Sequence, residues 1–94
     1  MTYIKVSWKH SNPNYPVLLF SELDDSRSET RKVEVFPDGT VGFADPAERA
    51  KSTGLGLEPL PPLEEIAENP EFEPEEITKE EFERMWTKRR SRAV

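Results

Sequence analysis

Residues 30–43 read TRKVEVFPDGTVGF, and this stretch carries the clearest structural pattern in the chain. Apolar and charged side chains alternate over residues 30–36, which is the period-two pattern of a strand with one buried face. Pro37-Asp38-Gly39 then predicts a tight turn, because proline presets the first corner, aspartate bonds to backbone and glycine accepts a left-handed conformation. Val41 and Phe43 resume the alternation, so the stretch predicts a β-hairpin.

Two further strands are expected before the hairpin. Ile4, Val6 and Trp8 alternate with polar side chains over Tyr3–Lys9, and we expect these three apolar groups to face the core. Pro16–Leu23 places apolar groups on both faces, which is typical of a central strand that is covered on both sides.

The best-specified helix lies near the end of the chain. Thr78 and Glu81 have the spacing of a capping box, in which the two residues satisfy exposed amides at a helix start. Ile77 and Phe82 have the spacing of a hydrophobic staple, and Trp86 continues the apolar stripe. A helix with one apolar stripe must bury it, and the sheet is the surface available.

Together these elements predict an α+β fold, in which a four-stranded antiparallel sheet, arranged as a meander, packs against a C-terminal α-helix, plus one short helix. The length predicts a single domain over residues 1–94. We expect strands in residues 1–45, then a loop, a short helix and an acidic segment in 46–76. The C-terminal helix is expected in 77–91 and a tail in 92–94.

Composition excludes several classes of function. The chain has no cysteine, which removes disulfides, thiol catalysis and thiolate zinc sites, and its one histidine is His10. A net charge of −6 disfavours nucleic acid as a partner, and the sequence has no apolar run of the ~18 residues that a membrane span needs. No residue constellation indicates catalysis. We therefore expect a cytoplasmic protein that is not an enzyme and needs no cofactor or metal.

Negative charge is concentrated in one part of the chain, since residues 58–83 hold eleven acidic residues and one lysine. The helix dipole accounts for the glutamates that begin the last helix, but not for seven others. These seven are Glu64, Glu65, Glu68, Glu71, Glu73, Glu75 and Glu76. With Asp24 and Asp25 they are the candidate partner-binding residues, because an acidic patch attracts a basic protein surface. A solvated acidic linker that aids solubility is the alternative.

A basic cluster offers a second candidate site. Arg27, Arg31 and Lys32 are close in sequence, and we expect them on a sheet edge, together with the Gly54–Gly56 loop. Guanidinium and ammonium groups bind anions through charge-assisted hydrogen bonds. This cluster would therefore take a nucleotide or another anionic small molecule.

Short motifs spread along the chain carry a family resemblance. The most specific are a Tyr-x-x-Val-x-Trp motif at Tyr3–Trp8 and Arg31–Phe36 followed by Asp38-Gly39. The other matching positions are Pro16, Ser21-Glu22-Leu23, Leu60-Pro61, Glu65-Ile66, Glu71-Phe72, Ile77, Glu81-Phe82 and Trp86. In these positions the chain resembles a small, uncharacterised bacterial domain family whose function is unknown. The resemblance implies a shared fold and assigns no catalytic residue, and such domains look similar to immunity-type proteins of bacterial toxin systems.

Two functional hypotheses follow. The first is a small protein-binding inhibitor, such as an immunity protein, an antitoxin or a phage protein that disables a bacterial defence factor. Its acidic side chains would occlude a basic surface of the partner, such as the cleft of a nuclease. The alternative is a small-molecule or nucleotide-binding module that uses Arg27, Arg31 and Lys32. The identity of the partner stays open, as does the choice between monomer and homo-oligomer.

Overall fold

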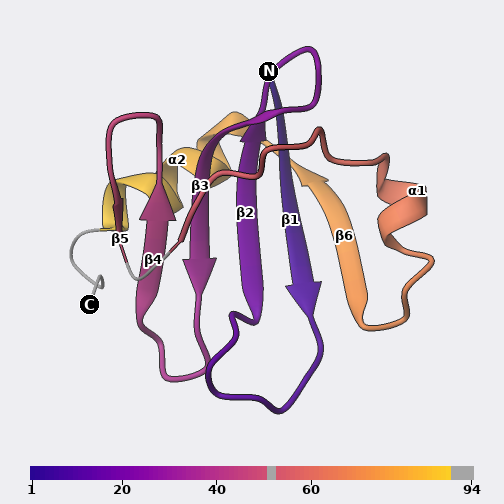
Figure 1. The fold of residues 1–94 in the computed structure, drawn as a ribbon, viewed down its shortest axis with the longest axis vertical. Helices are drawn as coiled ribbons and strands as arrows, with labels where there is room; N and C mark the ends of the chain where they lie inside the picture. Colours follow the sequence, from indigo (N-terminus) through magenta and orange to yellow (C-terminus); the bar gives the residue numbers. More distant parts are fainter. Residues whose placement is uncertain (51–52, 90–94) are drawn as a thin grey trace.

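Figure 1 shows the computed structural model, which describes residues 1–50 and 53–89. The elements in chain order are β1 (Thr2–Trp8), β2 (Leu18–Leu23), β3 (Glu29–Val35), β4 (Val41–Ala44), β5 (Arg49–Ala50), α1 (Leu63–Ile66), β6 (Phe72–Ile77) and α2 (Lys79–Lys88). Within these residues the strands form one antiparallel sheet of six strands in the order β5-β4-β3-β2-β1-β6.

The predicted α+β class is confirmed. β1 to β4 form the meander that hydrophobic alternation predicts, α1 occupies the expected short helix, and α2 packs on one face of the sheet. The prediction of four strands is wrong, because the two-residue β5 and the longer β6 extend the sheet at its two edges.

β6 forms where the sequence predicts the last part of an acidic segment within residues 46–76. Its sequence, FEPEEI, holds three glutamates and a proline, and it lacks the apolar alternation of a strand. β6 lies at the edge and pairs with β1 in a register that runs from Trp8↔Phe72 to Tyr3↔Ile77. Edge strands tolerate proline and charge, so pairing with β1 overrides a weak local pattern.

The turn between β3 and β4 has the predicted chemistry. The amide of Gly39 donates to the carbonyl oxygen of Phe36 at 2.9 Å, and Asp38 Oδ1 accepts a hydrogen bond from the amide of Thr40 at 3.0 Å. Gly39 has a φ of +88°, in the left-handed region where a side chain would be strained.

α2 begins as the capping box predicts. Thr78 is the N-cap, and its hydroxyl oxygen accepts a hydrogen bond from the amide of Glu81 at 3.1 Å. The helix begins at Lys79, directly after this cap, and Ile77, the first residue of the expected segment 77–91, ends β6. Residues 90–94, where the helix end and the tail are expected, lie outside the described residues. No helix in the described part of the chain is long and apolar enough to cross a membrane.

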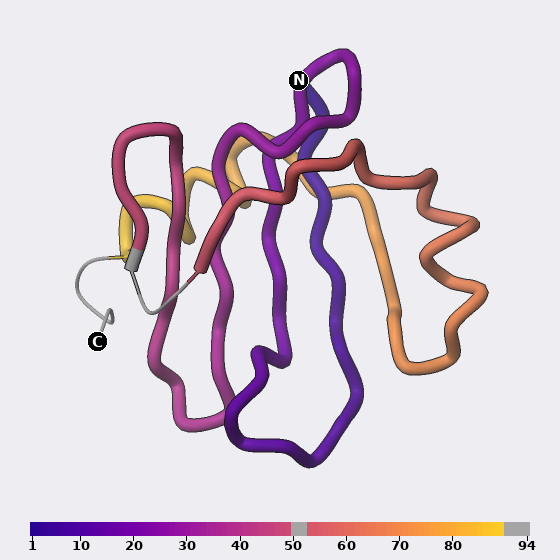
Figure 2. The backbone as a smooth tube through the Cα atoms, viewed as in Figure 1, coloured from indigo at the N-terminus to yellow at the C-terminus, as the bar shows by residue number. Residues whose placement is uncertain are grey.

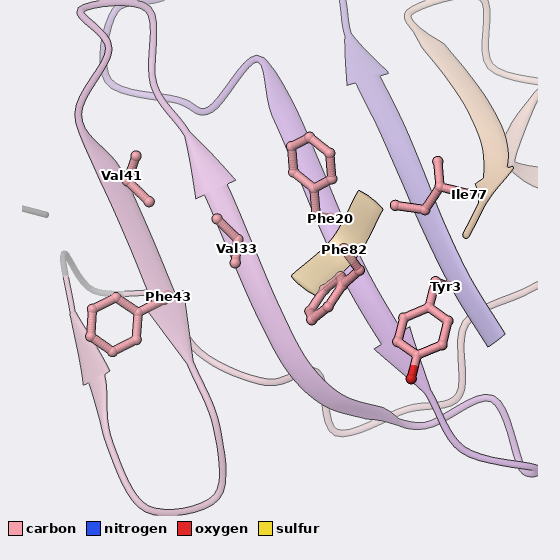
Figure 3. Close-up of a cluster of buried hydrophobic side chains, with 7 residues drawn as sticks. All are labelled: Tyr3, Phe20, Val33, Val41, Phe43, Ile77 and Phe82. Carbon is pink, nitrogen blue, oxygen red and sulfur yellow. The ribbon is translucent and has the colours of Figure 1, made fainter. Parts of the chain in front are cut away.

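The core lies between α2 and one face of the sheet, which we call the helix face. Figure 3 shows Phe82 reaching from α2 over the central strands. Phe82 is fully buried, and its ring centroid lies 5.4 Å from that of Tyr3. The buried cluster consists of Tyr3, Phe20, Val33, Val41, Phe43, Ile77 and Phe82. Burial of these apolar groups is the main source of stability for so small a domain.

β1 contributes apolar residues to both faces of the sheet. Tyr3 is buried on the helix face, and Ile4 is buried on the opposite face, because neighbouring residues in a strand alternate. Val6 and Trp8 share the second face with Ile4 but are only half-buried. The expectation that these three residues face the main core is therefore wrong, since that core lies under α2, although Ile4 is buried on the second face.

The second face is covered in part by residues 53–62, which we call the strap. Figure 2 shows the strap crossing the sheet from the β4 side towards α1. The amide of Gly56 donates to Glu29 Oε1 at 2.6 Å, and the hydroxyl of Thr53 donates to Glu34 Oε1 at 2.8 Å. Both glutamates belong to β3, so side chains of the sheet hold the strap by polar contacts.

Candidate protein-interaction surface

The strap leaves one part of the second face open, near the end of the sheet where β1 connects to β2. The apolar residues of this part, which we call the open face, are Val6, Trp8, Leu19, Phe72 and Pro74. Val6 pairs with Leu19 on one side and with Pro74 on the other, and Trp8 pairs with Phe72. The register therefore places all five side by side, and each is half-buried. A contiguous apolar patch that stays partly exposed is a candidate binding surface.

An apolar cleft of about 230 Å³ continues the open face towards α1. Val6 and Phe72 line it from the sheet, and Leu60 of the strap and Ile66 of α1 line it from the other side. The open face is thus concave on its α1 side.

Aromatic rings gather at the opposite side of the open face. Tyr15 is 50% exposed and stacks on Trp8, with ring centroids 5.5 Å apart and ring planes 12° apart. Trp8 also contacts His10 edge-on at 4.6 Å and Phe72 at 5.6 Å. Aromatic side chains that are both rigidly packed and accessible are common anchors of protein interfaces.

His10 fixes the loop that carries Tyr15. Its Nδ1 accepts a hydrogen bond from the amide of Asn12 at 3.0 Å, and its Nε2 lies 2.8 Å from the carbonyl oxygen of Pro16. The tautomer with its proton on Nε2 satisfies both bonds, because Nδ1 then accepts and Nε2 donates. The imidazole thereby ties the two ends of the loop to each other.

The seven glutamates predicted to bind a partner are all exposed, and the fold places them on or beside α1 and β6 at one edge of the sheet. Two of them have basic partners. Glu73 forms an ion pair with Lys9, and Glu75 forms one with Lys5 at 3.4 Å. These two pairs lie on the helix-face side of β6, and such exposed pairs add little stability.

Two of the other five glutamates border the open face. Glu71 accepts a hydrogen bond from the indole nitrogen of Trp8 at 3.3 Å, and Glu76 lies on the second face of β6, as its register with β1 shows. The remaining three, on or beside α1, are Glu64, Glu65 and Glu68. Glu71 and Glu76 thus lie at the open face itself, and the other three lie on or beside the helix whose Ile66 lines the cleft.

Asp24 and Asp25 lie elsewhere, in the turn between β2 and β3. Asp24 Oδ1 accepts hydrogen bonds from the amides of Ser26 at 2.9 Å and Ser28 at 3.0 Å, which is a structural role for an aspartate in a turn. Asp25 is exposed. β1 and β2 separate this turn from β6, so the structure does not join these two aspartates to the glutamates of that edge.

The prediction that Arg27, Arg31 and Lys32 lie together on a sheet edge is wrong. β3 is an interior strand, and Arg31 and Lys32 are neighbours in it, so they point to opposite faces. Arg27 lies in the β2–β3 turn with a φ of +64°, and its guanidinium donates to the carbonyl oxygens of Leu60 and Pro61 at 2.8 Å each. The three cations therefore hold different parts of the fold together and do not form one shared surface.

Arg31 organises a charged network beside α2. Its Nη2 donates to Glu22 Oε2 at 2.6 Å and to Glu83 Oε2 at 2.7 Å. Hydrogen bonding from Arg31 lowers the pKa of Glu22 to about 2, and it also lowers the pKa of Glu83. Burial raises the pKa of Tyr3, as does its hydrogen bond to Glu22. Because this network joins three strands to α2, we assign these shifts to structure and not to catalysis.

Sequence reasoning misses the aromatic part of the surface. Tyr15 lies among turn formers in the stretch SNPNYP, and Phe72 lies among glutamates, so neither belongs to an apolar period. The available signal is the aromatic ring itself, because a tyrosine surrounded by turn residues has no regular strand to bury it. In the described ranges, no group of three or more metal-ligating side chains is placed to hold an ion.

The fold and the surface together define a small α+β domain whose open sheet face is bordered by carboxylates. The chain matches the model of a family described as a domain of unknown function, DUF6881, over residues 2–91, and it belongs to this family. The resemblance to an uncharacterised domain family is confirmed to that extent. No curated protein and no solved structure matches the chain.

Proposed function

We propose that this domain is a small protein-binding inhibitor that covers a basic surface of its partner. The observation that supports the proposal most strongly is the placement of the acidic residues. Seven glutamates of residues 64–76 are exposed on or beside α1 and β6, and two of them, Glu71 and Glu76, border an apolar face that includes Trp8 and Phe72.

A folded acidic border suits recognition better than a flexible linker would. β6 is paired with β1 over six residues, so part of the carboxylate array is fixed before the partner arrives. Preorganisation lowers the entropy cost of association, and complementary charge raises the association rate and excludes wrong partners. The apolar residues of the open face supply the buried contact that charge alone does not provide.

The partner would meet the face of β6 and not its edge. Lys9 donates its amide to the carbonyl oxygen of Glu71 at 2.8 Å. Residue pairs along an antiparallel ladder are alternately hydrogen-bonded and not hydrogen-bonded. Counting from the bonded pair Lys9–Glu71, the pair Val6–Pro74 is not hydrogen-bonded, so the backbone groups of Pro74 point away from β1. Proline has no N–H, and the outward amide of Phe72 already donates to Asn69 at 3.0 Å. The edge is therefore a poor template for adding a further strand.

The proposal includes an immunity protein, an antitoxin and a phage protein that disables a bacterial defence factor, all acting in the cytoplasm. These share one physical mechanism, in which acidic side chains occupy a basic cleft and exclude its substrate. The physical class of the partner is thus a protein with a basic patch.

The test is a pull-down from the organism that encodes the chain, with matched charge reversals. Glu64→Lys/Glu68→Lys changes the acidic residues on and beside α1, and Asp25→Lys/Glu80→Lys changes net charge equally at exposed sites outside residues 64–76. We expect the first variant to lose the partner, with an association rate at least about tenfold lower, and the second to retain it. Circular dichroism checks that both remain folded. Equal retention by both variants, or loss by the second alone, would contradict the proposal.

A further inference from the structure

We infer that the partner inserts an arginine side chain into a hollow between Tyr15 and the β3–β4 turn, where the guanidinium stacks on the Tyr15 ring and faces Asp38. This inference rests on the proposed function and names the group that the surface recognises.

The hollow lies next to the open face and has a volume of about 670 Å³. Tyr15 and Pro16 of the β1–β2 loop line one side, and Phe36 and Asp38 of the β3–β4 turn line the other. The two loops leave the same end of the sheet (Figure 1), and residues of both line the hollow. A side chain with a flat, extended head group can enter from the solvent.

The charge of the hollow favours a cation. Of the residues that line the hollow, the two charged ones are Glu34 and Asp38, and both are acidic. Glu34 is half-buried and also serves the strap, because it accepts a hydrogen bond from Thr53 and lies 3.8 Å from Lys32 Nζ. Asp38 is exposed, so an entering cation can reach its carboxylate, whose Oδ1 also accepts hydrogen bonds from the amide and the hydroxyl of Thr40 at 3.0 Å and 2.7 Å.

The Tyr15 ring that lines the hollow favours arginine over lysine. Tyr15 exposes half of its surface while one face of its ring is held by Trp8. A guanidinium is planar and weakly hydrated, so it stacks on an aromatic ring and still donates in its plane to a carboxylate. An ammonium group lacks the plane and the fork of donors.

The site is built before binding. The stack on Trp8 limits the rotation of the Tyr15 ring, and His10 ties Asn12 to Pro16 across the loop. Asn12 Oδ1 also accepts a hydrogen bond from the amide of Asn14 at 2.9 Å. An aromatic side chain that is already ordered loses little entropy on binding, which is a property of interface anchors.

The experiment is an amide and indole NMR titration of the whole chain with the capped tripeptides Gly-Arg-Gly, Gly-Lys-Gly and Gly-Glu-Gly. We expect the arginine peptide to shift signals of residues 14–16, 36–39 and the Trp8 indole, the lysine peptide to shift them less, and the glutamate peptide to leave them unchanged. Tyr15→Ala should weaken the arginine peptide about two- to fivefold, whereas Tyr15→Phe should retain its affinity. Asp38→Asn should weaken binding, and Asp25→Asn should not.

Shifts scattered over all acidic regions, or an arginine affinity that Tyr15→Ala leaves unchanged, would overturn the arginine site. The spectra themselves report whether each variant is folded. If the peptide fails in this way while Glu64→Lys/Glu68→Lys still loses the natural partner, the arginine site is wrong and the inhibitor proposal stands. If the peptide binds as expected while that variant keeps its partner, the arginine site stands and the proposed role of the acidic border is wrong.

Discussion

Arg31 of β3 donates to Glu83 of α2 at 2.7 Å, and this bond joins the C-terminal helix to an interior strand of the sheet. The guanidinium lies over the rings of Phe82 and Trp86, at 5.0 Å and 5.1 Å from their centroids. It also bonds Glu22 at 2.6 Å, so one cation orients the helix against two strands. A side chain first predicted to bind a ligand is therefore part of the framework.

Stability should fall in acid because of this network. Hydrogen bonding from Arg31 lowers the pKa of Glu22 from 4.5 to about 2, so Glu22 stabilises the fold above its unfolded pKa. That contribution, roughly 3 kcal/mol, should be lost as pH falls from about 4.5 towards 2. Urea unfolding from pH 7 to pH 2 measures it, with Glu22→Gln as the comparison. A Glu22→Gln variant whose acid sensitivity equals that of wild type would contradict this account.

Phe82, and not Trp86, should be the main apolar link between helix and sheet. Phe82→Ala should destabilise by about 3–5 kcal/mol, because a fully buried ring leaves a cavity. Trp86 is half-buried between Arg31 and Arg89, so Trp86→Ala should cost less. Thermal unfolding of both variants tests the order, and a larger loss for Trp86→Ala would reverse the assignment.

Gly39→Val should destabilise by roughly 1–3 kcal/mol, because Gly39 has a positive φ that a β-branched residue cannot adopt without strain. Gly54→Val should cost less, since a Cβ at Gly54 would lie 3.6 Å from the nearest atom, Arg49 Nη1, at ordinary contact distance. Denaturation midpoints compare the two. Equal losses would show that the strap is as strained as the hairpin turn.

Pro74→Val should increase self-association, because it gives the β6 edge the outward amide that proline withholds. Glu73, Glu75 and Glu76 still repel a second copy, so the effect should grow with ionic strength. Sedimentation of the variant and wild type from low to high salt measures this. Identical sedimentation at every salt concentration would mean that charge or α1 protects the edge without help from Pro74.

The fold could be predicted where local pattern and tertiary role agree. The β3–β4 hairpin and the Thr78 cap follow from residues that act on their own neighbours in sequence. β6 could not be predicted, because its strand conformation depends on pairing with β1, 64 to 74 residues earlier, and its own residues favour a linker. Long-range strand pairing of this kind outweighs the local secondary-structure propensity, and it leaves no hydrophobic periodicity in the sequence.

The acidic character of the site could be predicted from the sequence, but the arrangement of its residues could not. Counting glutamates located the acidic edge, but their split between the two faces depends on strand register, which sends Glu73 and Glu75 towards lysines. Arg31 and Lys32 were expected to act together, yet adjacent strand residues point apart. The stack of Tyr15 on Trp8 joins a loop to a strand, so it requires the folded chain.

Amide hydrogen exchange of the chain, free and bound to its captured partner, tests whether the open face is the binding surface. We expect slower exchange in the complex over residues 8–17, 36–40 and 63–76, which hold the aromatic stack, the hollow and the acidic border. α2 and the β2–β3 turn should exchange at the same rate in both states. Protection confined to residues 79–88 or to 24–28, with the open face unchanged, would show that the partner binds elsewhere.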